Sequence, residues 1–332
     1  MHDRGVRSSC DAPTLLVVVD TEEEFDWNAP FDRKNTSVDH MRDVGLFQKV
    51  CDDAGVRPLY AVDYPIATQE TSAAPLREIL AAGHCEIGAH LHPWVTPPLE
   101  EEVNARNSYP GNLPRDLEKR KIETLLVAIE QHLGVRPRSY KSGRYGFGPN
   151  TGATLAELGF EVDLSPLPAF DLSADGGPDW SRASPEPRRI GPRLLSIPAT
   201  SDFVGYARGM GPGLHALATS PPFSWLGANA ILSRLGALDR LMLSPEGFLP
   251  EHHRRLTRSL LDRGVRVFSF TLHSPSLRPG CTPYVRSTAE LDKFLDACRR
   301  YFDFFLGEVA GVTRTPLELA RHLESSTSPV RA

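Results

Sequence analysis

The stretch LLVVVDTEEEFDW, residues 15–27, joins a short apolar segment directly to a cluster of carboxylates. Leu15–Val19 is continuous and mostly β-branched, which is typical of a strand buried on both faces of a parallel sheet. Asp20, Glu22 and Glu23 follow at once, so the first carboxylates should be partly buried. Carboxylates this close repel one another unless a cation or a proton neutralises some of them. A solvated acidic turn is the alternative interpretation, and the adjoining apolar strand disfavours it.

Outward from this stretch, short apolar runs alternate with amphipathic helical patterns. Repeated strand–helix units favour a parallel α/β barrel over an all-β fold. Two segments rich in Pro, Gly and Ser, 166–192 and 201–224, interrupt the rhythm, and we interpret them as long loops, the second a lid or an insertion. Further strands are predicted at 58–62, 85–89, 160–164, 194–198 and 265–272, and helices at 44–54, 74–83, 117–133, 151–158, 228–241, 251–263 and 288–306.

Composition narrows the class of protein. Of 332 residues, 40% are hydrophobic and 24% charged, which is typical of a globular domain, and the net charge of -5 opposes a nucleic-acid-binding role. The five cysteines form no Cys-x-x-Cys pair, so neither a disulfide framework nor a thiolate zinc site is expected. Reduced thiols, and the lack of an apolar run of signal-peptide or membrane-spanning length, predict a cytoplasmic protein without a membrane span. We predict a flexible segment 1–12, a barrel 13–310 and a tail 311–332 with one short helix.

A second polar cluster follows the predicted strand at 85–89, in the stretch EIGAHLHPW, residues 86–94. In an extended segment His90 and His92 point the same way, because side chains alternate with period two. Two imidazoles on one face, joined by a carboxylate from another strand, form a His/His/carboxylate metal site with open positions for water. We therefore expect a divalent metal here, and carboxyl ends of other strands to contribute to the same rim.

Two further clusters lie at strand ends. Residues 140–148, YKSGRYGFG, combine three glycines with two cations, which suits a loop that offers backbone N–H groups and positive charge to an anion or a sugar. His273 closes the predicted strand at 265–272, and beside a metal on the same rim it is a candidate general acid. Trp27, Trp94 and Tyr145 are candidates for stacking on sugar rings, with core packing as the alternative for each.

In their order and placement these motifs resemble the polysaccharide deacetylases, also called the NodB-homology family. The stretches EIGAHLHPW, YKSGRYGFGPNT and LHSPSLRPGCTPYVRS are similar to its WalW-like branch, which is linked to lipopolysaccharide biosynthesis, and the resemblance covers 14–306. It implies a deformed (β/α) barrel of about seven strands with long loop insertions. It also implies one divalent metal, usually zinc, and hydrolysis of an N-acetyl group on a sugar or glycan.

The resemblance also implies roles for the acidic and histidine residues. The family's acidic pair, base first and metal ligand second, falls on Glu22 and Glu23, while Asp20 competes for either role. His90 matches the first metal histidine. The second normally lies four positions later, where this chain has Trp94, so His92 takes its place.

Further roles follow for the other two motifs. Lys141 stands where the family has an arginine, a change that loses bidentate hydrogen bonding, and Arg144 could compensate. The backbone at Tyr145 matches the oxyanion-binding loop. His273 matches the catalytic acid and Leu272 the residue that lines the acetyl pocket. Asp163 lies where a carboxylate that orients a catalytic partner could sit.

Two other functions stay open on the sequence. One is an allantoinase-like C–N hydrolase on the same fold, without a metal or with different chemistry, which the Glu22–Glu23 pair would suit. The other is a glycan-binding relative that has lost catalysis, because the motifs at Lys141 and Trp94 depart from the family pattern. The identity of the sugar, its carrier and the oligomeric state are not determined by the sequence.

Overall fold

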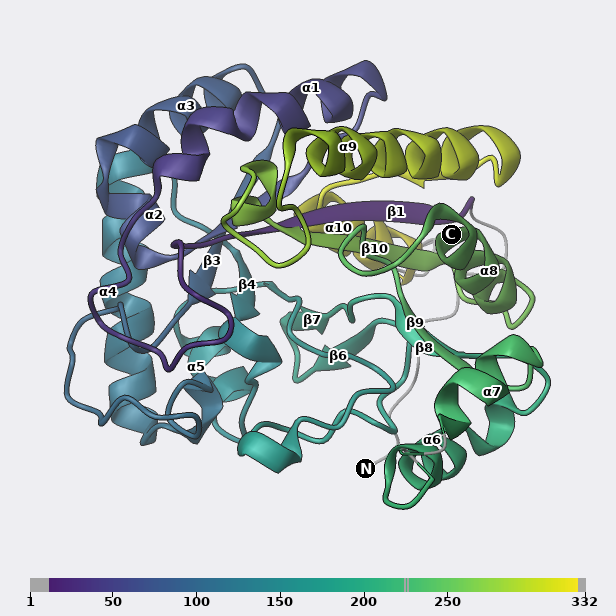
Figure 1. The fold of residues 1–332 in the computed structure, drawn as a ribbon. Helices are drawn as coiled ribbons and strands as arrows, with labels where there is room; N and C mark the ends of the chain where they lie inside the picture. The colour runs from purple at the N-terminus through teal and green to yellow at the C-terminus, as the bar shows by residue number, and fades with distance from the viewer. Residues whose placement is uncertain (1–11, 224, 226, 328–332) are drawn as a thin grey trace.

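The computed structural model describes residues 12–223, 225 and 227–327. Its main sheet has nine strands and curls into a half-barrel (Figure 1), in the order β10-β1-β2-β3-β4-β5-β7-β6 with β11 also paired to β1. Neighbouring strands are parallel from β10 through β7, and β6 pairs antiparallel with β7 at the edge. These strands are β1 (Thr14–Thr21), β2 (Leu59–Val62), β3 (Glu86–Leu91), β4 (Ser139–Ser142), β5 (Val162–Asp163), β6 (Arg188–Ile190), β7 (Leu194–Ser196), β10 (Val267–His273) and β11 (Val312–Thr313).

The α/β class and the barrel-like parallel sheet are confirmed, although the barrel is open between β10 and β6. Helices cover its outer face, as Figure 1 shows for α1, α3 and α9. The helices are α1 (Val44–Asp53), α2 (Tyr64–Thr68), α3 (Glu70–Ala81), α4 (Arg115–Leu133), α5 (Thr151–Glu157), α6 (Gly211–Thr219), α7 (Ala228–Arg234), α8 (Pro250–Leu261), α9 (Thr288–Asp303) and α10 (Pro316–Thr327). None of these described helices combines the length and the apolar character needed to cross a bilayer.

The alternation of β1 determines which side chains enter the half-barrel. Val17 and Val19 belong to the large core beneath the outer helices, whereas Leu16 and Val18 belong to a smaller core inside the curl of the sheet. The inner core is closed from below by apolar side chains of α10. Because side chains alternate with period two, the inner face of β1 continues from Val18 to Asp20 at the carboxyl end. The functional side chains of the other parallel strands follow the same rule.

The predicted helix at 228–241 is wrong in its second half. α7 ends at Arg234, Gly236 takes a left-handed conformation with φ +66, and the chain then enters strand β9 (Asp239–Met242). A glycine in this conformation ends a helix, and the apolar residues that follow it belong to the strand. The predicted loop at 201–224 is likewise wrong in part, because it contains strand β8 (Ser201–Val204), paired antiparallel with β9, and helix α6.

The tail contains helix α10, where one short helix was predicted. This helix packs against the inner core. The predicted flexible segment 1–12 lies outside the described residues except for its last residue, and the domain boundaries stay a prediction.

Candidate active site

The carboxyl ends of the parallel strands meet around one cavity of about 430 Å³. It opens between the loops after β1, β3, β4 and β10, where the polar clusters of the sequence lie. Its lining is Asp20, Glu22, Phe25, Asp26, Trp27, Ala29, Phe31, His90, His92, Tyr109, Arg144, Tyr145, Leu167, Phe170, Leu172, Met242, Ser244, Glu246, Phe248, His273 and Tyr284. Carboxylates and imidazoles therefore converge on a pocket whose walls are largely aromatic and aliphatic.

Glu22, His90 and His92 form the most compact group of metal-ligating side chains in this cavity. Glu22 Oε2 lies 3.5 Å from His90 Nε2 and 3.4 Å from His92 Nε2, and all three side chains are buried. Burial alone would raise the pKa of Glu22, but the neighbouring imidazoles of His273, His90 and His92 outweigh it and lower that pKa. The carboxylate is thus held in its charged, ligating form.

The hydrogen bonds of the two imidazoles leave their Nε2 atoms directed at Glu22. His90 Nδ1 donates to the backbone carbonyl of Lys141 at 3.0 Å, and His92 Nδ1 donates to Glu23 Oε2 at 2.8 Å. In a neutral imidazole, a proton on Nδ1 leaves Nε2 as a lone-pair donor. Metal-bound histidines characteristically use their second nitrogen in this way.

A metal ion fits this group on three observations. Glu22 Oε1 is buried and has no hydrogen-bond partner among the described residues, although such an atom normally has one. Ligand atoms bound about 2.1 Å from a tetrahedral ion lie roughly 3.4 Å apart, which matches the two separations from Glu22 Oε2. Two imidazole nitrogens and one carboxylate oxygen are also a donor set that zinc accepts.

Glu23, Asp63 and His92 form a second group of possible ligands, but hydrogen bonds occupy its oxygen atoms. Glu23 Oε1 accepts from Trp94 Nε1 at 2.7 Å and Glu23 Oε2 from His92 Nδ1. Asp63 Oδ1 accepts from the backbone N–H of Ile66, and Asp63 Oδ2 from that of Glu23, both at 2.8 Å. Burial raises the pKa of Glu23 to about 7 and that of Asp63 well above its usual range. This group therefore supports His92 from behind, and Asp63 is a contributor that the sequence analysis missed.

Asp20 and Lys141 form a buried ion pair beside the ligand group. Lys141 Nζ donates to both Asp20 oxygens, at 2.7 and 2.6 Å, and it lies 4.9 Å from the centre of the Tyr145 ring. Burial would raise the pKa of Asp20, but Lys141, His90 and His273 outweigh it and lower that pKa. Asp20 is therefore a charged carboxylate on the cavity wall, held in place by Lys141.

His273 faces the ligand group from β10. Its Nε2 lies 3.6 Å from Asp20 Oδ2, and its Nδ1 donates to Glu246 Oε2 at 2.6 Å. Burial would lower the pKa of His273, but Glu246, Glu22 and Asp20 outweigh it and raise the pKa to about 10. The imidazole is thus a protonated acid aimed into the cavity.

Glu246 is a candidate functional residue that the sequence analysis did not identify. Its Oε1 also accepts hydrogen bonds from the backbone N–H of His273 and the hydroxyl of Ser276. Its signal was its position in the short segment that follows β9, and the helix wrongly predicted over that strand concealed it.

The loop after β4 approaches the ligand group closely. A Cβ atom at Gly143 would lie 2.4 Å from the Leu91 carbonyl and 2.5 Å from His92 Cδ2, so only glycine fits there. Arg144 and Tyr145 both adopt left-handed conformations, at φ 54 and 57, which non-glycine residues rarely take and which cluster at functional sites.

Arg144 does not compensate for Lys141. Its guanidinium binds Ser108 and Asp175 and stacks 4.1 Å from the Tyr109 ring, so it lines the cavity away from Asp20. Tyr145 also lines the cavity, and its carbonyl accepts a hydrogen bond from Trp180 Nε1.

Besides Glu23 and Lys141, three residues of the sequence analysis do not line the cavity. Trp94 is buried, its ring stacks on that of His92 with 4.2 Å between ring centres, and its N–H donates a hydrogen bond to Glu23. It therefore lies behind the ligand group. Leu272 belongs to the outer core, because it alternates with His273 on β10. Asp163 alternates with the inward-facing Val162 in the same way and binds Ser165 and Ser196. Glu246 instead is the carboxylate that binds His273, the place that the resemblance suggested for Asp163.

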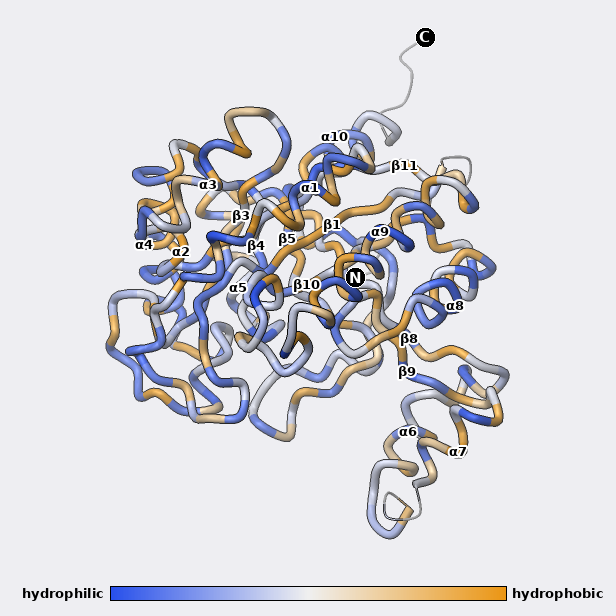
Figure 2. Tube along the Cα trace, turned by 45° about the horizontal axis from the view of Figure 1, so that its top comes forward, coloured by the Kyte–Doolittle hydropathy of each residue, from blue (hydrophilic) through white to orange (hydrophobic). Residues whose placement is uncertain are grey.

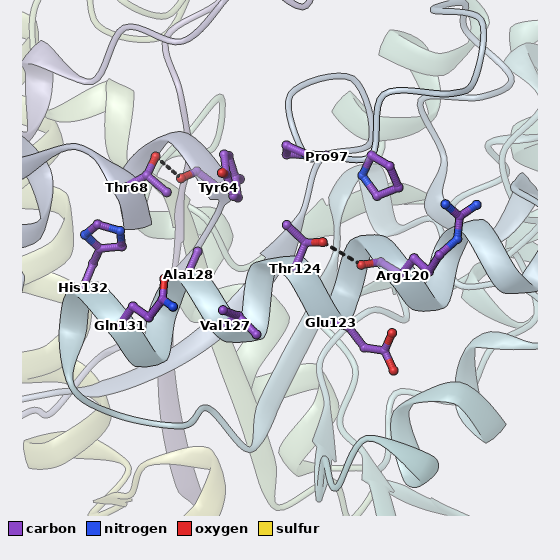
Figure 3. Close-up of a pocket in the computed structure, with 11 residues that line it drawn as sticks. Tyr64, Thr68, Pro97, Arg120, Glu123, Thr124, Val127, Ala128, Gln131 and His132 are labelled. Carbon is purple, nitrogen blue, oxygen red and sulfur yellow. Dashed lines mark hydrogen bonds between the residues drawn. The ribbon is translucent and has the colours of Figure 1, made fainter.

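A larger cavity of about 540 Å³ lies along α4 (Figure 3), but it lacks this convergence of polar groups. The hydroxyls of Thr68 and Thr124 donate to carbonyls of their own helices, those of Tyr64 and Arg120. The Arg120 guanidinium is paired with Glu100. Among the described residues, neither group of possible metal ligands lies at this cavity.

Comparisons with known proteins give similarity at the level of the fold. No protein-family model matches the sequence, and no curated protein matches it significantly. The structure is similar to a candidate polysaccharide deacetylase from Mycobacterium smegmatis (TM-score 0.54, 18% identity, 100% of this chain and 98% of the other covered). It is also similar to Puue allantoinase (0.58, 15%, 98% and 95%) and to a branching enzyme from Thermococcus kodakaraensis (0.51, 14%, 95% and 72%). The chain therefore has the α/β half-barrel fold that these three proteins share.

Proposed function

We propose that this protein is a metal-dependent hydrolase that removes an N-acetyl group from a sugar or glycan intermediate. One observation carries the proposal. The side chains of Glu22, His90 and His92 form one group in the cavity. The imidazole of His273 faces this group and has a carboxylate partner of its own, Glu246. This arrangement separates a ligand group from a proton donor, as hydrolysis of an amide requires.

Glu22, His90 and His92 would hold a divalent ion, and their donor atoms favour zinc. A divalent ion at this place would lower the pKa of a water molecule and polarise the amide carbonyl. Glu23 fixes the ring of His92, and the Lys141 carbonyl fixes that of His90. Glu22 is therefore the proposed metal ligand, and Glu23 supports His92. The resemblance implied different roles, with Glu22 as the base and Glu23 as the ligand.

Asp20 is the proposed base. Its charged carboxylate lies on the cavity wall, and it would accept the proton of the attacking water. His273 would donate a proton to the departing amine nitrogen, with Glu246 holding the ring in place. The backbone N–H of Tyr145 is the proposed donor to the developing negative charge on the carbonyl oxygen. Such a donor is typically worth about 10²–10³-fold in rate.

The aromatic wall of the cavity suits a sugar ring. Trp27 lies edge-on to His273 with 4.9 Å between ring centres, and Tyr284 lies edge-on to Trp27 at 5.5 Å. Trp27 Nε1 is buried without a partner among the described residues, so its N–H is available to a sugar hydroxyl. The WalW-like assignment and the role in lipopolysaccharide biosynthesis stay predictions.

The deciding experiment pairs elemental analysis of the purified protein with an acetate-release screen over N-acetylated sugars, sugar nucleotides and glycans. We expect one equivalent of zinc or a similar ion, and acetate release that disappears with a chelator and returns with added metal. Acetate release that is unchanged in chelated, metal-free protein would contradict the metal-dependent mechanism.

An allantoinase-like hydrolase is the second candidate. The short contacts from Glu22 to His90 and His92 are also possible ion pairs, which would hold the group together without an ion. Hydrolysis of allantoin by the metal-free protein, without acetate release from any sugar, would favour this candidate.

A further inference from the structure

Exposed apolar side chains gather on one projecting element, the hairpin, which we define as the described residues 203–223, 225 and 227–238 with helices α6 and α7. Figure 2 shows α6 and α7 extending away from the rest of the molecule beyond the β8–β9 ribbon. Seven of the twelve exposed large hydrophobic residues in the described chain belong to the hairpin: Tyr206 (76%), Met210 (63%), Leu217, Phe223, Trp225 (83%), Ile231 and Leu235 (65%). A patch this concentrated marks a site of interaction.

Packing within the hairpin does not account for these side chains. Its core is small, and Leu214 and Leu232 are the residues of α6 and α7 that pack against buried Phe203 and Leu238. Leu217 and Ile231 lie on the same two helices but are half exposed. Both helices are therefore apolar on the face that packs and on the face that does not.

The charge of the hairpin differs from that of the rest of the chain. No aspartate or glutamate occurs between Asp202 and Asp239, whereas the whole chain carries a net charge of -5. The two formally charged residues in this interval are Arg208 and Arg234. In the part of the chain that the structure describes, neither forms an ion pair, and Arg208 donates to the carbonyl of Gly205.

A lipid surface suits this combination of side chains. Exposed Trp225 and Tyr206 are of the type that concentrates where a bilayer meets water, and unpaired arginines favour anionic headgroups. Helices of nine and seven residues are about 14 and 10 Å long, well short of the roughly 30 Å of a bilayer core, so the element would lie in the surface. In a twofold contact between two copies, both pairs of arginines would be buried without a carboxylate of the hairpin to pair with them.

We propose that the hairpin docks the protein on the surface of an anionic lipid bilayer. The apolar side chains enter the boundary between headgroups and acyl chains, and Arg208 and Arg234 contact lipid phosphates. This inference does not depend on the proposed chemistry, because none of these residues lines the active-site cavity.

The test is co-flotation of the full-length protein with vesicles of phosphatidylcholine alone and of phosphatidylcholine mixed equally with phosphatidylglycerol. We expect binding to the anionic vesicles that weakens as salt is added. Replacing three hairpin residues, Y206S with W225S and L235S, should weaken binding about tenfold or more. The matched control, L46S with L99S and V127S, removes three exposed apolar side chains elsewhere and should bind like the wild type. The pair R208Q and R234Q should lose the preference for anionic vesicles.

A second measurement does not depend on the folding of the triple variant. The fluorescence of Trp225 in the wild type should shift to shorter wavelength when anionic vesicles are added, and the shift should be absent in W225F. Failure of the wild type to bind either kind of vesicle, or equal binding by the hairpin variant and its control, would overturn the proposal. A dimer detected by light scattering and lost in the hairpin variant, without vesicle binding, would instead assign the surface to a second copy.

Discussion

His92 and His273 occupy opposite sides of the same cavity, and each donates its Nδ1 proton to a glutamate, at 2.8 and 2.6 Å. Their pKa values nevertheless move in opposite directions. Burial lowers the pKa of His92, and the charges of Glu22, Asp63 and Asp20 do not reverse this. For His273 the effect of burial is outweighed by Glu246, Glu22 and Asp20, and the pKa rises to about 10.

The difference lies in the other partners of the two glutamates. Burial raises the pKa of Glu23 to about 7, the charge of Glu22 adds to this rise and a hydrogen bond with Asp63 opposes it, so Glu23 is only partly charged near neutral pH. Glu246 instead accepts two further hydrogen bonds from the segment 273–276, which hold its side chain beside His273. In the proposed mechanism, a histidine–glutamate pair would thus provide a neutral metal ligand in one setting and a proton donor in the other. The predictions below separate these two roles.

The largest effect is expected from H90A on the ligand side. Removing one of three ligands should abolish both bound metal and acetate release, because the two remaining ligands hold zinc poorly. Metal content by elemental analysis and acetate release check both outcomes, with H132A, an exposed histidine on α4, as the control. Turnover by a metal-free H90A protein would contradict the ligand assignment.

H273A should instead remove turnover and leave the metal bound. Loss of a general acid typically lowers kcat about 10²–10⁴-fold. The measurement is kcat alongside metal content in the same preparation. If H273A loses its metal together with its activity, His273 belongs to the ligand group. That result would contradict its assignment as a separate proton donor.

A smaller effect is expected from E246Q, which leaves the imidazole but removes the nearest charge that raises its pKa. The working form of His273 is protonated, so activity falls as the pH rises through its pKa. With that pKa lowered, the fall in kcat/KM on the alkaline side should begin at lower pH than in the wild type, while metal content stays unchanged. The full pH–rate profile of both proteins checks this, and an alkaline limb that does not move would exclude His273 as the titrating acid.

The sequence was sufficient for the parts of the site that follow the period of a strand. His90 and His92 share a face because they lie two residues apart at the end of β3, and Asp20 follows the inner face of β1. If the alternation of side chains along β1 is continued by two residues, Glu22 lies on the same face as Asp20 and Glu23 on the opposite face. The resemblance to a family with adjacent acids favoured the other order.

The missing parts depend on contacts between distant segments. Glu246 lies 27 residues before His273, after a strand that was predicted as helix because Ile231–Leu241 is rich in apolar residues. Asp63 lies 40 residues beyond Glu23 and carries no pattern of its own, since one acid after a strand is also a common helix cap. For Trp94, sugar stacking and core packing both stayed open, because an aromatic ring near histidines has the same local sequence in either position. Only the packing of the loop after β3 places it behind the ligands.

The smallest effect is expected from W94F, which tests that placement. Phenylalanine retains the ring that stacks on His92 but cannot donate to Glu23 Oε1, so Glu23 loses one of its hydrogen bonds and holds His92 less firmly. Loss of a residue that supports a metal ligand typically costs about 10–100-fold in metal affinity, and the change should lie at the lower end because the Glu23–His92 bond remains. KM should stay near the wild-type value, whereas W27F, on the cavity wall, should raise KM and leave metal affinity unchanged. Competition with a zinc chelator measures the affinity, and steady-state kinetics at saturating metal measures KM. A raised KM with unchanged metal affinity in W94F would indicate that Trp94 contacts the sugar. It would contradict a role of Trp94 in supporting His92.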